Sequence, residues 1–281
     1  MQHVLYILMS LAFVAATAAS QDTDPAEDLL TINESVTTEM QAVLDSIGEI
    51  KADADAAVDL YSRRGDARMF LGQFADAVAD YQAMVKLKPE LDASQWRLGI
   101  ALYYADKPEG AAAQFDRYHS FDKVDRENGI WRYLSHHKAF GRDKAREQLL
   151  KYDKDDRPPF KEVYQLFDGR LSSDDVLKSI TSDLPETARN TRLFYSHLYI
   201  GLLDAVEDRP ESAQRSLTTA TLNPWPRKSG FGPNWMWHVG RLELKRLQEV
   251  KAEERTACSV DCTSRAASVS DRSAIWFLPQ Q

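Results

Sequence analysis

Two cysteines, two adjacent histidines and a short acidic run are the residues with the most evident potential for chemistry. Cys258 and Cys262 are the only cysteines among the 281 residues, and the three residues between them miss the CxxC spacing of redox motifs. His136 and His137 are neighbours, so on a helix they point to different sides and are poorly placed to bind one metal ion. The DKDD run at 153–156 lacks the spacing and the glycine of a calcium loop, so we expect solvated surface there.

The motifs of common catalytic sites are missing as well. The sequence has no HExxH, no P-loop, no GxSxG and no GxGxxG after a strand. It therefore predicts neither catalysis nor a bound metal or cofactor. The two cysteines are expected to form a local disulfide if the chain is exported, and to be free thiols if it is not.

The clearest organisation of the chain is a repeat of 34 residues within Tyr61–Tyr118. The recurring pairs are Gly65 and Gly99, Ala77 and Ala111, and Tyr81 and Phe115. We expect each unit to be two antiparallel helices, with the small residues where the helices approach closely and the aromatic residue filling the gap to the next unit. Gly72 suits the left-handed residue that ends a first helix, and Pro89 cannot continue a second one.

This period and pattern resemble the tetratricopeptide repeat (TPR) family, which points to binding rather than catalysis. The resemblance implies an all-α, TPR-type solenoid of helical hairpins with capping helices at both ends. Extending the period gives repeats at about 58–91 and 92–125, a degenerate repeat at 126–157, a helical insert at 160–190 and a repeat at 194–225. The recurring structural positions of the later units are Ala145, Gly201, Ala213 and Pro224.

The resemblance also implies which residues line the concave groove of the solenoid. The positions that match the groove-facing positions of the family are Met69, Phe70, Trp96, Ile100, Tyr103, Tyr104, Leu134, Tyr195 and Leu198. They lack the Lys/Arg/Asn set with which chaperone-binding TPRs grip a peptide carboxylate. One interpretation is a groove for an apolar or aromatic peptide, and the other is a core covered by the leader helix or by the chain's own insert.

A second resemblance covers about 60–250 and concerns the NlpI-like family of bacterial envelope TPR proteins. Its motifs match Trp131, Tyr133, Leu134, Gly169, Leu171, Ser172, Phe194, Tyr195, Tyr199, Ala213, Leu242 and Leu244. The resemblance implies a periplasmic adaptor that brings a protease together with peptidoglycan hydrolases. This chain lacks the lipidated cysteine of that family, so the resemblance does not extend to its membrane tether.

The N-terminal segment predicts export. Residues 1–20 contain an apolar run of signal-peptide length followed by small residues, although an N-terminal membrane anchor is the alternative. No other segment is long and apolar enough to cross a bilayer, so the mature chain is expected in the periplasm or secreted. The net charge is −8, and 21–60 holds about eleven acidic residues and one basic residue, which disfavours nucleic-acid binding.

Both ends of the predicted solenoid carry further segments. An acidic, flexible leader is expected at 21–35, followed by an amphipathic helix at about 36–50 that caps the first repeat, lies in the groove or mediates a homodimer. After the last repeat, a loop rich in proline, glycine and tryptophan is expected to seal the open end, or to form an aromatic surface patch. A capping helix at 234–255 and a flexible tail at 256–281 follow.

The sequence as a whole therefore predicts an exported, non-enzymatic scaffold or adaptor that binds protein or peptide partners. By the second resemblance, a periplasmic protease or a peptidoglycan hydrolase is the expected partner class. The alternative is a structural protein that self-associates through its terminal helices.

Overall fold

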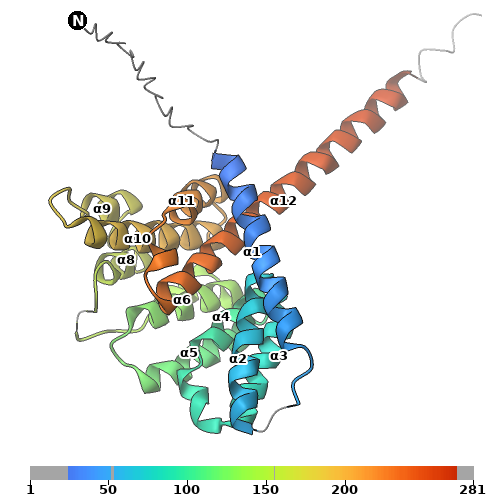
Figure 1. The fold of residues 1–281 in the computed structure, drawn as a ribbon. Helices are drawn as coiled ribbons and strands as arrows, with labels where there is room; N and C mark the ends of the chain where they lie inside the picture. Colours follow the sequence, from blue (N-terminus) through green and yellow to red (C-terminus); the bar gives the residue numbers. More distant parts are fainter. Residues whose placement is uncertain (1–24, 52–53, 155, 271–281) are drawn as a thin grey trace, which may run out of the picture.

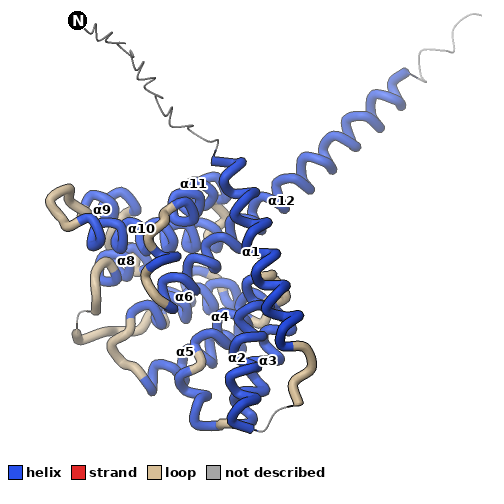
Figure 2. The backbone as a smooth tube through the Cα atoms, viewed as in Figure 1, coloured by secondary structure: helices blue, strands red, loops and turns tan. Residues whose placement is uncertain are grey.

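The protein is all-α throughout the part that the computed structural model describes, which is residues 25–51, 54–154 and 156–270, with side chains as far as Glu253. Figure 2 shows helices and connecting loops over these residues. The α-helices are α1 (Pro25–Ile47), α2 (Ala54–Phe70), α3 (Phe74–Leu87), α4 (Trp96–Tyr104), α5 (Pro108–Phe121), α6 (Arg126–Phe140), α7 (Arg142–Glu147), α8 (Phe160–Phe167), α9 (Ser173–Lys178), α10 (Glu186–Val206), α11 (Pro210–Leu222) and α12 (Phe231–Ser270). Short 3-10 segments lie at Pro89–Ser94 and Pro226–Lys228. The predicted signal peptide at 1–20 lies outside the described residues.

The helices pack largely in the order in which they occur along the chain (Figure 1). Helix α2 pairs with α3, α4 with α5, and α10 with α11, while α3 packs on α4 and α5 packs on α6. Helix α1 packs on α2 at the front of this stack and also on α11 near its end. The stack therefore curves enough for one helix to contact both its early and its late members.

Close approach within the hairpins depends on glycine. A Cβ atom added to Gly65 would lie 2.7 Å from the ring of Tyr81, and one added to Gly99 would lie 2.7 Å from the ring of Phe115. The equivalent distance at Gly201 is 2.6 Å, to Cγ of Leu217. The contact thus recurs at the spacing that the sequence predicts, because only glycine leaves room for the side chain of the second helix.

The turn between the two helices of a hairpin also recurs with this spacing. Gly72, Asp106 and Asp208 all have positive φ, of 80°, 58° and 59°. In each case the N–H of the following residue donates to a carbonyl five residues earlier, as from Gln73 to Arg68 at 2.8 Å. These bonds satisfy carbonyl groups that the end of a helix leaves free, so each first helix stops at the same place in its unit.

The segment after α6 departs from this regularity. Helix α7 is six residues long. Ala145 within it is buried, at the position that Ala111 and Ala213 occupy in the other repeats. The short helices α8 and α9 lie in the segment expected to be a helical insert, and Ser172 and Asp175 form a capping box at the start of α9. This part of the chain supplies short helices and loops instead of a further long hairpin.

The terminal helices are longer than the sequence predicts. Helix α1 begins at Pro25, inside the segment expected to be flexible, because Leu29 and Val36 are both buried and two acidic residues occupy its first turn. Helix α12 begins at Phe231 and continues to Ser270, through residues expected to form a loop and a tail. Figure 1 shows its first part among the other helices and its second part projecting away from them.

A carboxylate in α2 joins four of the helices. Asp66 accepts hydrogen bonds from Tyr81 Oη of α3 at 2.7 Å, from Arg97 Nη1 of α4 at 2.9 Å, and from Trp235 Nε1 of α12 at 2.9 Å. Hydrogen bonds to a charged acceptor contribute about 1.5–3 kcal/mol each. The hydrogen bonds to Asp66 therefore hold α12 against the front of the stack.

Candidate functional site

The residues predicted to line a groove lie in the interior of the protein, and Phe70 and Trp96 among them lie under the first half of α12. Met69, Phe70, Ile100, Tyr103, Leu134, Tyr195 and Leu198 are buried, and Trp96 and Tyr104 are partly buried. The ring of Phe70 stacks on His238 with centroids 3.8 Å apart, and Trp96 meets Trp235 edge-on at 4.8 Å. The element that covers these aromatic residues is therefore α12.

Polar groups of α12 complete this contact. Arg241 donates to the carbonyl of Phe70 and, at 2.8 Å, to Oδ1 of Asn33 in α1. Burial beside Glu243 raises the pKa of Tyr103 well above its ordinary value. The main cover over Phe70 and Trp96 is therefore α12, which was not among the covers expected from the sequence. The expected cover by the insert holds for Tyr195, because Phe160 of α8 packs on its ring with centroids 5.0 Å apart.

The aromatic residues after the last hairpin divide between surface and core. Trp235 and Trp237 are both 1% exposed and lie in α12, within the span predicted for the capping helix. Trp237 Nε1 donates to the carbonyl of Thr221 in α11 at 2.8 Å, so these residues cover the last hairpin, as expected, but from a helix and not from a loop. Phe231, at the first turn of the same helix, is 61% exposed. The pair Cys258 and Cys262 lies in the part of α12 whose side chains are not described, and the expected disulfide stays a prediction.

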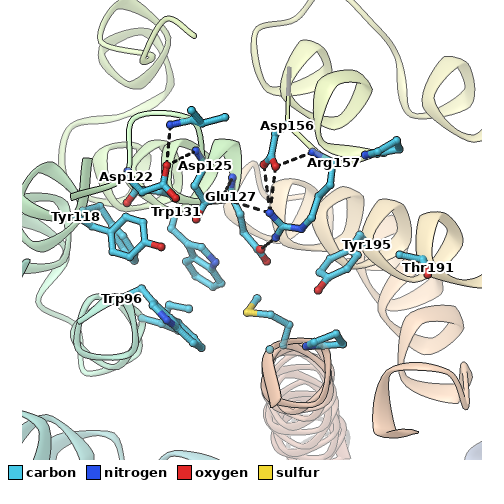
Figure 3. Close-up of a pocket in the computed structure, with 18 of the residues that line it drawn as sticks. Trp96, Tyr118, Asp122, Asp125, Glu127, Trp131, Asp156, Arg157, Thr191 and Tyr195 are labelled. Atoms are coloured by element: carbon cyan, nitrogen blue, oxygen red, sulfur yellow. Dashed lines mark hydrogen bonds and ion pairs between the residues drawn. The ribbon is translucent and has the colours of Figure 1, made fainter. Parts of the chain in front are cut away.

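A cavity of about 530 Å³ lies beside the covered residues. Its walls come from α4, α5, the α5–α6 loop, α6, the loop at 156–158, α10, the chain just after α11 and the first turns of α12. The lining residues are Trp96, Ile100, Phe115, Tyr118, Asp122, Val124, Asp125, Glu127, Asn128, Trp131, Asp156, Arg157, Pro158, Thr191, Tyr195, Trp225, Gly232, Pro233 and Met236. Figure 3 shows the side chains converging on this space from both sides, with α12 below them. We call it the acidic–aromatic pocket.

One side of the acidic–aromatic pocket is a network around Arg157 (Figure 3). Its guanidinium lies 2.5 Å from Oε2 of Glu127, 3.3 Å from Oδ2 of Asp156 and 3.8 Å from Oδ1 of Asp125. The arginine side chain is 50% exposed, whereas those of the three carboxylates are 12–19% exposed. Negative charge is thus held partly buried at the wall, under a cation that reaches solvent.

The sequence places these acids through local turns. Asp125 is the N-cap of α6, and its side chain accepts the backbone N–H of Glu127 at 3.0 Å. Asp122 accepts the backbone N–H groups of Val124 at 2.8 Å and Asp125 at 3.2 Å. Caps of this kind are typical of aspartate, and they fix two carboxylates at the entrance to α6.

Glu127 is the most perturbed of these acids. Burial raises its pKa to about 7, against the opposing effect of Arg157, and the neighbouring carboxylate of Asp125 adds to the rise. The hydroxyl of Tyr199 donates a hydrogen bond to Oε1 of the same glutamate. Burial likewise raises the pKa of Asp125. A carboxyl group that titrates near neutral pH therefore lies in the wall of the pocket.

Aromatic side chains line the acidic–aromatic pocket on both sides of this network (Figure 3). Trp96, Trp131 and Tyr118 line it from the α4–α6 side, and Tyr195 and Trp225 line it from the α10 side. Trp131 is 2% exposed, and its indole Nε1 is buried without a hydrogen-bond partner in the part of the chain that the structure describes. Buried polar groups are normally paired, so a free donor in the lining of a cavity is informative.

Sequence reasoning missed most of this site. Asp156 belongs to the run that was expected to be solvated, but its side chain is 12% exposed and contacts Arg157. Trp96, Ile100 and Tyr195 were predicted as groove residues, and all three line the pocket. The available signal was the density of acids at 122–127, in DKVDRE, at the start of a helix that carries Trp131 and Tyr133.

The described residues contain no group of three or more His, Cys, Asp or Glu side chains that could hold a metal ion. His136 and His137 lie in α6, where burial lowers the pKa of both imidazoles. Among the helices whose residues are described, none is long and apolar enough to cross a membrane. The sequence matched no protein-family model and no curated protein.

Proposed function

We propose that this protein is an exported, TPR-type scaffold or adaptor that binds protein or peptide partners, and that its partner-binding site is the acidic–aromatic pocket. Two recurrences support the repeat assignment. One is the contact between a glycine and a large side chain at Gly65, Gly99 and Gly201, and the other is the left-handed turn at Gly72, Asp106 and Asp208. Both follow the 34-residue spacing that is typical of TPR hairpins.

The observation that carries the choice of site is the position of α12. This helix covers Phe70 and the residues around it, so a partner could use that face only by displacing buried contacts such as Trp235 on Asp66. The acidic–aromatic pocket keeps its space while α12 is in place. Pockets that combine apolar walls with a few directed polar groups are the usual binding sites of folded proteins.

The partner class rests on the sequence resemblance. A periplasmic protease or a peptidoglycan hydrolase fits an adaptor of the NlpI-like type, and an adaptor needs no catalytic group of its own. We therefore propose a periplasmic or secreted protein without enzymatic activity.

The second candidate is a structural protein that self-associates through its terminal helices. The observation in its favour is the second part of α12, which projects away from the other helices (Figure 1). Light scattering over a hundredfold range of concentration separates the two candidates. A monomer at every concentration removes the self-association proposal, whereas a concentration-dependent dimer supports it.

The proposed site is tested by blocking the pocket without touching its core. Thr191 lines the acidic–aromatic pocket from α10, and Thr191→Arg would fill part of the space. Thr187 lies one turn earlier on the same helix, is exposed and does not line the pocket, so Thr187→Arg is the matched control. The mature chain and both variants are immobilised and compared for quantitative capture from envelope extract.

We expect Thr191→Arg to lose the partners that the wild-type chain enriches, and Thr187→Arg to retain them. Equal capture of every enriched partner by the two variants would exclude the acidic–aromatic pocket as the binding site.

A further inference from the structure

The charge of the acidic–aromatic pocket is unbalanced. Asp122, Asp125, Glu127 and Asp156 line it, and among its described lining residues Arg157 is the one cation. Arg157 contacts three of the four acids, whereas Asp122 is bound by backbone N–H groups. Even with Glu127 protonated, negative charge remains in excess. A ligand that enters this space therefore gains by carrying positive charge.

The aromatic side of the pocket favours the same kind of ligand. Indole and phenol faces attract ammonium and guanidinium groups, with about 0.5–2 kcal/mol for each contact. The protein already uses this pairing nearby, because Arg157 lies over the ring of Phe160 at 4.3 Å and Arg97 lies over that of Phe231 at 5.6 Å. Carboxylates and aromatic faces that meet in one cavity suit a cation on an apolar stem, as in lysine and arginine.

The indole of Trp131 indicates what else the ligand carries. Trp131 lines the cavity, and its Nε1–H group is buried and has no acceptor among the described residues. Leaving such a donor unpaired costs about 1–3 kcal/mol, which a ligand acceptor would recover. A peptide offers carbonyl oxygens beside its side chains, whereas a free amine does not.

We propose, on the basis of the function proposed above, that the acidic–aromatic pocket binds a lysine or arginine side chain of a partner polypeptide. The cationic head lies against the carboxylates, the aliphatic stem lies between the tryptophan and tyrosine rings, and a backbone carbonyl of the partner accepts from Trp131 Nε1. The pocket of about 530 Å³ has room for such a side chain and its neighbouring peptide groups.

The test uses capped pentapeptides of alanine with arginine, citrulline or norleucine at the centre, titrated into the full mature chain by calorimetry. Citrulline keeps the shape of arginine and removes its charge. We expect the arginine peptide to bind at least about tenfold more tightly than either neutral peptide, and its affinity to fall as salt is raised.

Charge-removing variants assign the binding to the pocket. Asp122→Asn with Asp156→Asn keeps one acceptor oxygen on each side chain and removes two charges from the lining. The control is Asp143→Asn with Asp174→Asn, two exposed acids of α7 and α9 outside the lining. We expect the first pair to lose about tenfold in affinity for the arginine peptide, and the control pair to lose none.

Three outcomes would overturn this assignment. Equal affinity for the arginine and citrulline peptides would show that the ligand need not be a cation. Equal loss of affinity in both variant pairs would show that the peptide does not bind in the acidic–aromatic pocket. Agmatine is a guanidinium amine without a backbone carbonyl. If it bound as tightly as the arginine peptide, the peptide backbone would not be part of what the pocket recognises. If Thr191→Arg abolishes partner capture while the peptides show no preference for charge, the proposed function stands and the ligand class is wrong.

Discussion

Gly99 and Gly110 lie in the same hairpin and differ in the space that is left for a Cβ atom. A Cβ at Gly99 would lie 2.7 Å from the ring of Phe115, whereas one at Gly110 would lie 3.8 Å from Leu102. We expect Gly99→Ala to destabilise the protein by about 1–3 kcal/mol, because the ring is 0% exposed and has little space to move. Gly110→Ala should stabilise it by about 0.5–1 kcal/mol, through helix propensity.

Urea unfolding of the two glycine variants gives both values. A Gly99→Ala protein as stable as the wild type would show that the helices of the hairpin do not pack as tightly as described.

Glu127 makes stability depend on pH. Its carboxyl group has a pKa of about 7 in the folded protein, because of burial, against an ordinary value of 4.5. Between these values the folded state keeps a proton that the unfolded state has released, so stability is full below pH 4.5 and falls as pH rises toward 7. The effect is on the order of 3 kcal/mol at most. The charged groups that face the carboxylate are Arg157, Asp125 and Asp156.

Glu127→Gln removes this titration while keeping the size of the side chain. We expect the variant to gain stability relative to the wild type as pH rises from 5 to 8, measured by urea unfolding at each pH. Glu109→Gln, at an exposed position in α5, serves as the control and should run parallel to the wild type. Parallel curves for Glu127→Gln as well would contradict the assignment of this group.

At the scale of elements, α12 decides whether the residues predicted to line a groove are covered. Its first half lies among α2, α10 and α11, and Trp235 and Trp237 are buried there. Trp235→Ala should cost about 3–5 kcal/mol, because it removes a large buried ring and the hydrogen bond to Asp66. Phe231→Ala, one turn earlier at a ring that is 61% exposed, should cost less than about 1 kcal/mol.

Thermal unfolding of the Trp235 and Phe231 variants measures this difference. Similar, small losses for both would mean that α12 is held only loosely against the other helices, and the predicted groove would again be open to partners.

The hairpins were predictable from the sequence because their determinants are local and periodic. Gly65 and Tyr81 lie 16 residues apart, and the same pair of roles returns 34 residues later at Gly99 and Phe115. The position of α12 depends instead on contacts such as Trp235 with Asp66, which are 169 residues apart. No periodicity connects such residues, so a proline- and glycine-rich start was interpreted as a loop.

The acidic–aromatic pocket could not be predicted for a related reason. Glu127 and Tyr199 meet across 72 residues, and the pocket exists because α10 returns beside α6. Residue types alone indicated that aromatic residues such as Trp96 belonged to a binding surface or to the core. In the structure one side chain can belong to both the core and the pocket, because Trp96 packs on Trp235 and also lines the pocket.

At the scale of the whole molecule, the described helices form a curved stack in which α12 packs against α2, α10 and α11, and the proposed binding pocket lies beside it. A partner bound in the acidic–aromatic pocket, as proposed, would leave the contact between Trp235 and Asp66 in place. Such a surface suits an adaptor, because binding leaves the rest of the exterior free for a second partner.

Site-specific photo-crosslinking tests this central claim most directly. A benzoylphenylalanine is placed at Tyr118, in the lining of the pocket, or at Thr219, an exposed position of α11 outside it. Each protein is irradiated with the partner captured by the wild-type chain. The account predicts crosslinks from position 118 that Thr191→Arg abolishes, and none from position 219. Crosslinks from position 219 with none from position 118 would contradict it.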